Sequence, residues 1–386
     1  MSAGEIPKKP HTALRGASGE LRHEQCFTRA GFDGPFSILY HLHAPHVHEA
    51  WSASPDGWAA PVAGYVRDDN LLLRRHYRSQ ELSENALSPL NARVPMLFSE
   101  DIVASVAKPG TSDTCYFENV DGDDLHYIHE GRGVLRTSFG DVSFQAEDYL
   151  YIPRGVRHRF ILEEGVTQVW FTMELLGDMH VPTQFRNPVG QLKMDAPYTH
   201  RDFRRPVFSG PVDEGIRTVV GKRHGRFTAY EYKESPLDVV GWDGTVWPWA
   251  FPIRAFQPKT STVHLPPTIH TTFAARGALI CSFVPRLVDY HPESIPCPYP
   301  HSSVNCDEII FYCKGNFTSR KGIDSGSISH HPNGTMHGPH PGAYEESMGH
   351  RETNELAVMI DTFKPLMPTT AAADTEDVDY HASFRP

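Results

Sequence analysis

The stretch EIIFYCKG (Glu308–Gly315), followed after a short gap by HPNGTMH (His331–His337), decides the fold of this chain. The first motif places a carboxylate at the start of an apolar, β-favouring run that ends in glycine. The second motif makes a Pro-x-Gly turn, in which glycine accepts positive φ and proline fixes its own, and it ends on a histidine. A strand, a hairpin and a tight turn in this order predict antiparallel β-structure that directs the histidine back towards the carboxylate.

An earlier part of the chain repeats this arrangement. DLHYIHEG (Asp124–Gly131) has the same spacing from carboxylate to glycine, and PRGVRH (Pro153–His158) has the same Pro-x-Gly-x-x-His order. An internal repeat of this size predicts two related units. Elsewhere, short β-rich runs alternate with Gly, Pro, Asn and Asp, which favours an all-β sandwich or barrel. A weak helical pattern covers residues 69–78.

These patterns predict two jelly-roll-like β-barrels joined by irregular segments. We place residues 1–257 in the first unit and residues 258–386 in the second. The less regular stretch 185–260 is expected to pack the two units together. Residues 1–20 and 367–386 are polar or small, and we expect them to be arms or tails.

The composition and net charge of the chain limit the kinds of molecule that it is expected to bind. The chain has 386 residues, 39% hydrophobic and 22% charged, which is typical of an ordinary globular protein. Its formal charge of −11 argues against nucleic acid or an anionic membrane as a partner, because both attract basic surfaces. The apolar runs are far too short to span a membrane, and the N-terminus lacks the apolar core of a signal peptide. We therefore expect a cytoplasmic protein.

Three residues of the second unit are candidate metal ligands: His301, Glu308 and His337. Two histidines and one carboxylate leave open positions on a metal such as ferrous iron. Side chains alternate along a strand, so residues 302–306 must bend or bulge if His301 and Glu308 are to converge. Asp307 competes for the carboxylate role, but we favour Glu308 because its spacing to the next glycine matches that in the first unit.

The first unit has only part of this pattern. It keeps Asp124 and His158, but residues 114–118 offer no histidine where a second one is required. Two ligands hold a divalent ion poorly. We therefore predict that the first unit is structural and free of metal.

Another group of histidines lies near the N-terminus, at His41, His43, His46 and His48. Only Glu49 stands nearby as a carboxylate, and there is no Pro-x-Gly turn. A loop over the active site or a subunit contact is therefore favoured over a second metal site.

The clearest motifs of the chain resemble those of a known protein family. The chain resembles the cupin superfamily and, within it, the homogentisate 1,2-dioxygenases, most sharply in YPHSSVNCDE (Tyr299–Glu308) and MHGPH (Met336–His340). The resemblance extends over about residues 20–365. It implies an all-β bicupin with a degenerate first cupin, Fe²⁺ in the second, and a homo-oligomer, either a trimer or a hexamer.

The resemblance also implies roles for individual residues. The family's iron ligands fall on the three residues that the spacing selects. Its acid/base histidine matches His264 in VHLPP, and a further histidine beside the iron matches His331. We expect His264 to accept or share a phenol proton, and His331 to orient substrate or oxygen.

Some residues depart from the family pattern. Better-known members have one residue fewer between the first histidine and the glutamate, and an Asp where this chain has His340. Phe317 and Arg320 stand where the family tends to have Tyr and Lys. A guanidinium suits a carboxylate, so Arg320 is the first candidate for binding a substrate carboxylate, with Arg286 and Tyr299 as lesser ones.

The predicted function is an Fe²⁺-dependent ring-cleaving dioxygenase that acts on homogentisate and O₂. One alternative keeps this chemistry but acts on a gentisate-like acid or another hydroquinone, because the pocket residues differ from the family pattern. A second alternative is a metal-binding cupin without oxygenase activity, such as an isomerase, a small-molecule binder or a storage protein.

Overall fold

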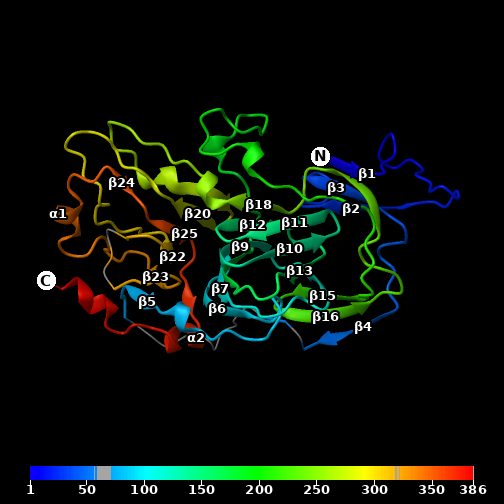
Figure 1. Cartoon of the computed structure of the whole chain (residues 1–386), viewed down its shortest axis with the longest axis horizontal. Coiled ribbons are helices and arrows are strands. Elements are labelled where there is room, and N and C mark those ends of the chain that lie inside the picture. The colour runs from blue at the N-terminus through cyan, green and yellow to red at the C-terminus, as the bar shows by residue number, and fades with distance from the viewer. Residues whose placement is uncertain (56, 59–70, 318–319, 321, 386) are drawn as a thin grey trace.

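The structure is a computed structural model that describes the chain except for residues 56, 59–70, 318–319, 321 and 386. Its described residues form five β-sheets, arranged as two units side by side along the long axis of the molecule (Figure 1). The prediction of an all-β protein with two units is therefore confirmed.

The first unit is built on two seven-stranded sheets. One has the order β11 (Gly140–Gln145), β10 (Arg132–Thr137), β13 (His158–Leu162), β8 (Tyr116–Asn119), β15 (Thr218–Arg223), β16 (Arg226–Glu231) and β4 (Ala50–Ser54). The other has the order β18 (Trp249–Pro252), β12 (Asp148–Ile152), β9 (Asp123–Glu130), β14 (Val169–Leu175), β7 (Ile102–Ala107), β6 (Arg93–Phe98) and β26 (Met367–Pro368). A buried aromatic and aliphatic core that includes Leu135, Phe160 and Trp170 joins them.

A four-stranded sheet adds to the first unit, with the order β1 (Ser2–Gly4), β17 (Val239–Gly244), β3 (Phe36–His41) and β2 (His23–Thr28). The predicted N-terminal arm is therefore partly a strand, because Ser2 to Gly4 pair with β17.

The second unit has one six-stranded sheet and one two-stranded sheet. The six strands have the order β19 (Thr271–Ala275), β20 (Ala278–Phe283), β25 (Leu356–Thr362), β22 (Asp307–Lys314), β23 (Ile328–His331) and β5 (Arg75–Tyr77). The small sheet pairs β21 (Arg286–Leu287) with β24 (Glu352–Thr353). Loops therefore form much of the layer that faces the six-stranded sheet.

Helices are few and short. The α-helices are α1 (Ala343–Ser347) and α2 (Thr370–Asp374). The 3₁₀ turns are η1 (Ser79–Glu81), η2 (Thr183–Phe185), η3 (His200–Asp202), η4 (Ile253–Ala255), η5 (Pro267–His270) and η6 (Tyr380–Phe384). Within the described ranges, no helix has the length and apolar character needed to cross a membrane.

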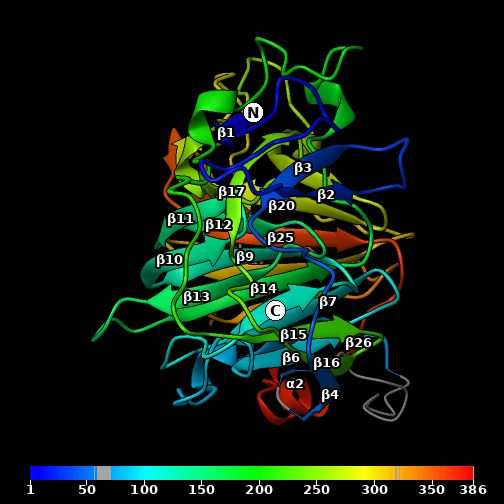
Figure 2. The ribbon, with the colours of Figure 1, turned by 90° about the vertical axis from the view of Figure 1, so that its right-hand side faces the viewer.

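Side chains point alternately to the two faces of β22, and this alternation determines on which face the site of the second unit lies. Ile309, Phe311 and Cys313 point into a core shared with the first unit, whereas Glu308 and Ile310 line a cavity on the opposite face. The shared core lies between the six-stranded sheet and the β9 sheet of the first unit. Figure 2 looks from the first unit and shows β25 behind β9 and β14. The strand that bears Glu308 is therefore held in place by core packing on the face opposite to the site.

The internal repeat appears as matching strand registers. Asp124 in β9 lies opposite Ile152 in β12, and Glu308 in β22 lies opposite His331 in β23. On the other side, Asp124 pairs with Glu174 of β14, as Glu308 pairs with Asp361 of β25. The two motifs thus occupy equivalent places in the two units.

Two strands cross the predicted boundary at residue 257. β5 comes from the N-terminal part of the chain but pairs with β23 in the second unit (Figure 1). β26 comes from the C-terminal part but pairs with β6 in the first unit (Figure 2). The weak helical prediction at 69–78 is wrong where the structure describes it, because β5 is a strand; residues 69 and 70 lie outside the described residues. Tertiary pairing with β23 overrides a weak local preference.

Candidate metal centre

A backbone bridge brings two of the predicted ligands together. The N–H of His301 donates to the carbonyl of His337 at 2.8 Å, and the N–H of His337 donates to the carbonyl of His301 at 2.9 Å. The Pro-x-Gly turn makes this possible, since Gly334 has φ +76° and its N–H donates to the Ser303 carbonyl at 2.8 Å. Residues 302–306 form no strand, so the chain bends between His301 and β22 as the spacing requires.

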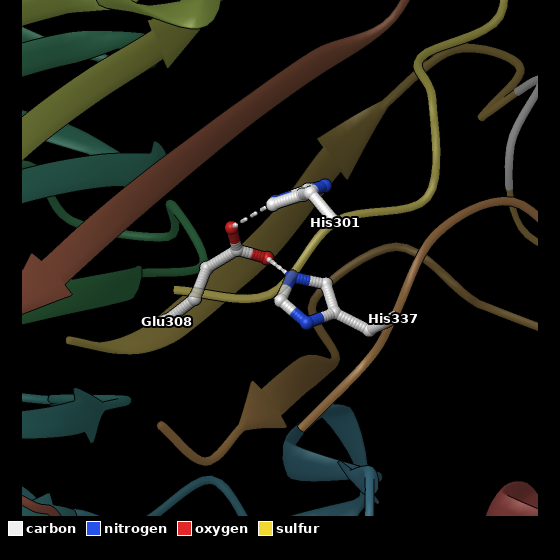
Figure 3. Close-up of side chains that lie close together, drawn as sticks. All are labelled: His301, Glu308 and His337. Carbon is white, nitrogen blue, oxygen red and sulfur yellow. Dashed lines mark ion pairs between the residues drawn. The ribbon is translucent and has the colours of Figure 1, made fainter. Parts of the chain in front are cut away.

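The three predicted ligands converge. One ligand atom from each of His301, Glu308 and His337 lies within 4.8 Å of the others, and among the described residues no other such group of three forms (Figure 3). Nε2 of His301 lies 3.7 Å from Oε2 of Glu308, and Nε2 of His337 lies 3.5 Å from Oε1. Each Nδ1 is held by a backbone carbonyl, Tyr299 at 3.2 Å and Thr335 at 2.8 Å. A proton on Nδ1 leaves the Nε2 lone pairs directed towards Glu308.

The electrostatics of this group suit a cation. Burial raises the pKa of Glu308, but its contacts with His301, His331 and His337 outweigh burial and hold that pKa well below its usual range. Nε2 of His337 is buried and has no hydrogen-bond partner among the described residues. A buried nitrogen without a partner next to an ionised carboxylate is a costly arrangement that a bound metal ion would satisfy. The residues present therefore fit a divalent ion.

His331 contacts the carboxylate directly. Its Nδ1 donates to Oε1 of Glu308 at 2.7 Å, and its ring stacks on that of His337 with centroids 4.2 Å apart and planes 14° apart. Burial lowers the pKa of His331 to about 3, so the ring is neutral and can donate this bond. His331 is not among the residues that line the cavity. It orients Glu308.

Asp307, the competing carboxylate, is fully engaged elsewhere. Its oxygens accept hydrogen bonds from Nε2 of His330, the N–H of Asn333 and the N–H of Leu366, each at 2.9 Å. Alternation along β22 places it on the face opposite to Glu308. Asp307 is not part of the group that converges.

A cavity of about 560 Å³ opens beside this group. His301 and Glu308 form part of its wall, and His264 and Tyr299 form another part. Apolar side chains also line it: Ile269, Phe283, Ile310, Phe317 and Met359. An apolar pocket with a few convergent polar groups is typical of a site for a small molecule.

The predicted substrate-binding residues all line this cavity, but their partners differ. Nη1 of Arg286 lies 3.0 Å from Oε1 of Glu355, so its charge is already paired. Nη1 of Arg320 donates to the carbonyl of Gly338 at 2.6 Å, next to His337. The hydroxyl of Tyr299 lies 3.1 Å from Nε2 of His264.

In the first unit, side-chain cations occupy the equivalent place. Both oxygens of Asp124 accept hydrogen bonds from Arg93, at 3.0 and 3.1 Å. Lys222 is fully buried and pairs with Glu174, and its Nζ lies 3.9 Å from the centre of the Trp58 ring. Sequence reasoning missed Arg93 and Lys222 because no local motif links them to the repeat.

The N-terminal histidines have a carboxylate that the sequence did not indicate. Nδ1 of His41 lies 2.7 Å from Oδ1 of Asp238, and Nδ1 of His43 lies 3.0 Å from Oδ2. His48 instead packs edge-on against Trp51 and Tyr230. These contacts are hydrogen bonds and ring packing within the first unit.

Comparisons with known proteins agree with the motifs. A family model described as homogentisate 1,2-dioxygenase N-terminal matches residues 103–253. A protein of Saccharolobus solfataricus described as "Putative dioxygenase" is 35% identical over 388 residues, which cover 99% of this chain and 97% of that protein.

Two solved structures also match at low similarity. One is a cupin 2 conserved barrel domain protein from Leptotrichia buccalis, with 9% identity, a TM-score of 0.34, and coverage of 76% of this chain and 99% of that chain. The other is a mutant of the oxalate decarboxylase of Bacillus subtilis, with 9% identity, a TM-score of 0.35, and coverage of 78% and 81%. Scores this low add no weight to the assignment.

The two related β-units with a histidine–glutamate group are those of a two-barrel cupin. The chain belongs to the homogentisate 1,2-dioxygenase family within that superfamily.

Proposed function

We propose that this protein is an Fe²⁺-dependent ring-cleaving dioxygenase that adds both atoms of O₂ to homogentisate (2,5-dihydroxyphenylacetate) and gives maleylacetoacetate. One observation carries the proposal: His301, Glu308 and His337 converge at the wall of a cavity of about 560 Å³ in a chain of the homogentisate 1,2-dioxygenase family.

These three residues would hold the iron, through two imidazole nitrogens and one carboxylate. When bound, Fe²⁺ supplies open coordination positions at which a phenolate oxygen and O₂ can meet. His331 would keep the carboxylate of Glu308 in place through its 2.7 Å hydrogen bond. The backbone bridge between His301 and His337 would fix the two imidazoles relative to each other.

His264 would take the phenol proton. It lines the same cavity as Glu308, and its Nε2 faces the hydroxyl of Tyr299. An imidazole is the side chain best suited to receive and return a proton near neutral pH. The apolar wall formed by Phe283, Ile310 and Met359 would pack against the aromatic ring.

Arg320 would pair with the substrate carboxylate. It lines the cavity, and its hydrogen bond to the Gly338 carbonyl fixes the guanidinium close to the turn that carries His337. Arg286 is a weaker candidate, since Glu355 already neutralises it. Tyr299 could contribute one neutral hydrogen bond.

A second candidate keeps the chemistry and changes the substrate. Phe317 and Arg320 stand in the cavity wall where a Tyr and a Lys are typical of the family. This difference favours a gentisate-like acid or another hydroquinone. A third candidate, a metal-binding cupin that is not an oxygenase, would bind the metal without consuming O₂.

Oxygen uptake and product absorbance test these candidates together. The purified protein would be loaded with Fe²⁺ under anaerobic conditions and then given homogentisate, gentisate and unsubstituted hydroquinone in aerated buffer. Oxygen uptake with a ring-opened absorbance from homogentisate alone supports the first candidate. Turnover of gentisate or hydroquinone instead would support the second candidate, with that compound as the substrate. If the protein binds iron but consumes no oxygen with any compound, only the third candidate, a cupin that is not an oxygenase, is left.

We make three further proposals. The family resemblance supports a homo-oligomer, either a trimer or a hexamer. The sequence patterns support a cytoplasmic location and a boundary between the units near residue 257. Light scattering of the eluted protein would give the mass of the assembly. A monomeric mass of 43.3 kDa would contradict the oligomer.

A further inference from the structure

His264 lies on a segment that no strand or helix holds. It falls in the irregular stretch between η4 and η5, and 59% of its side chain is exposed. An imidazole on such a segment samples several rotamers unless neighbouring groups restrain it. Its orientation towards the cavity therefore needs a local explanation.

Asp289 supplies the restraint on one side. One carboxylate oxygen, Oδ1, accepts the N–H of Ser261 at 3.1 Å, and the other, Oδ2, accepts the N–H of Leu265 at 3.3 Å. Oδ2 also lies 3.7 Å from Nδ1 of His264. The N–H of Tyr290, the next residue, donates to the carbonyl of Ser261 at 3.0 Å. Asp289 thus holds the segment at residues on both sides of His264 and faces its ring.

Tyr299 supplies the restraint on the other side. Its hydroxyl lies 3.1 Å from Nε2 of His264, and its backbone carbonyl accepts a hydrogen bond from Nδ1 of His301 at 3.2 Å. Asp289, His264, Tyr299 and His301 therefore form a continuous series of contacts, and all four line the cavity.

We propose that Asp289 is a positioning residue that fixes the tautomer and orientation of His264. A carboxylate can only accept hydrogen bonds, so its presence at Nδ1 favours the proton on that nitrogen and leaves the lone pair on Nε2. At 3.7 Å this contact is longer than a hydrogen bond, and catalytic contacts are often long before substrate binds.

This inference rests on the proposed function of the same cavity. In the proton step, the substrate O–H bond breaks and its proton forms a new N–H bond at Nε2 of His264. The imidazole becomes an imidazolium, and the phenol becomes a phenolate. Asp289 keeps its negative charge throughout and stabilises the imidazolium, as the aspartate does beside the histidine of a serine protease.

The test compares Asp289→Asn with Glu345→Gln in the Fe²⁺-loaded protein. Glu345 is an exposed carboxylate on α1 that is not among the residues lining the cavity, so its replacement removes the same charge away from the site. We expect kcat of Asp289→Asn to fall by about 10- to 100-fold, less than the about 10²–10⁴-fold lost with an acid/base group itself. KM and iron content should stay at wild-type values, Glu345→Gln should behave as wild type, and Asp289→Glu should recover part of the loss.

A second readout does not depend on turnover. The ¹⁵N chemical shifts of the His264 ring, assigned by the signals lost in His264→Gln, report which nitrogen carries the proton. We expect the Nδ1–H form in the wild type and a mixture in Asp289→Asn. Unchanged ring shifts, or a loss of iron that parallels the loss of kcat, would overturn the proposal. If the wild type consumes no O₂, the proposed function fails, but the ring shifts still decide what Asp289 does.

Discussion

The backbones of His301 and His337 are joined by two hydrogen bonds, at 2.8 and 2.9 Å, so one short bridge places both imidazoles. Their ring centroids lie 4.3 Å apart, and Glu308 lies on β22, the strand that follows His301 in the chain. The site is thus assembled mainly by main-chain contacts. Substituting a side chain should remove a ligand without disturbing the frame that holds the others.

Replacing His337 by alanine should abolish iron binding and turnover together. The variant loses a buried nitrogen at the point of convergence, while the bridge, which uses only backbone atoms, remains. Iron content and oxygen uptake measure the two effects. Met336→Ala is the matched control, because Met336 is the neighbouring residue and is 62% exposed. Full activity with iron retained in His337→Ala would remove this residue from the ligand set.

Replacing His264 by alanine should leave iron in place but lower kcat by about 10²–10⁴-fold, the usual contribution of one acid/base group. The ring of His264 faces Tyr299 and Asp289, neither of which is one of the three proposed ligands. Steady-state kinetics with the best substrate of the panel, together with iron content, check this expectation. A rate equal to that of the wild type would exclude His264 from the proton step.

Replacing Arg93 by methionine should destabilise the first unit by about 3–5 kcal/mol, the usual cost of leaving a buried charge without its partner. Asp124 is that charge: burial raises its pKa, but Arg93, together with His126 and His158, outweighs burial and holds the pKa below the usual 3.8. In the wild type, this contribution to stability is therefore full above pH 3.8 and is lost as the pH falls through the lower folded value.

The variant should show the opposite dependence on pH. Without Arg93, burial is opposed only by the contributions of neighbours such as His126 and His158, so we expect the pKa of Asp124 to rise. Lowering the pH from 7 to 5 should then protonate the carboxyl and reduce the cost. Urea unfolding at both pH values measures this change. The double variant Arg93→Met/Asp124→Asn is the control and should be less destabilised at pH 7. If the single and double variants lose the same free energy of unfolding, the ion pair between Arg93 and Asp124 contributes little to stability.

Replacing Phe311 by alanine should lower the free energy of unfolding by about 3–5 kcal/mol, because it empties a fully packed position. The ring of Phe311 stacks on Phe171 of the first unit with centroids 4.8 Å apart and planes 5° apart, so the loss should weaken the contact between the units. Phe363→Ala is the control, since Phe363 is 49% exposed and should change stability little. A thermal midpoint shared by both variants and the wild type would contradict this picture.

The sequence predicted the parts of the molecule that depend on local chemistry. A period of two along β22 and a Pro-x-Gly turn are local features, and they indicated the sheet, the repeat and the three residues that converge. The choice of Glu308 over Asp307 followed from the repeat, and the structure places their side chains on opposite faces of the strand.

Contacts between residues far apart in the chain could not be predicted in this way. Asp238 lies 197 residues from His41, and Glu376 lies 301 residues from Arg75, yet each pair is joined by a hydrogen bond. The hydrogen bond from His331 to Glu308 also depends on the register between β22 and β23, which periodicity does not set. Such pairs follow from tertiary packing, which no short motif encodes.

The exchange of β5 and β26 between the units affects how the protein can be made. Residues 367–368 follow the other strands of the second unit in the chain, so the sheet that receives β26 stays one strand short until those strands have been synthesised. A split-protein design that separates the chain at residue 257 would deprive each fragment of an edge strand. The two units therefore depend on each other for a complete sheet, even though both contain the same motif of a carboxylate, a glycine and a Pro-x-Gly turn that ends on a histidine.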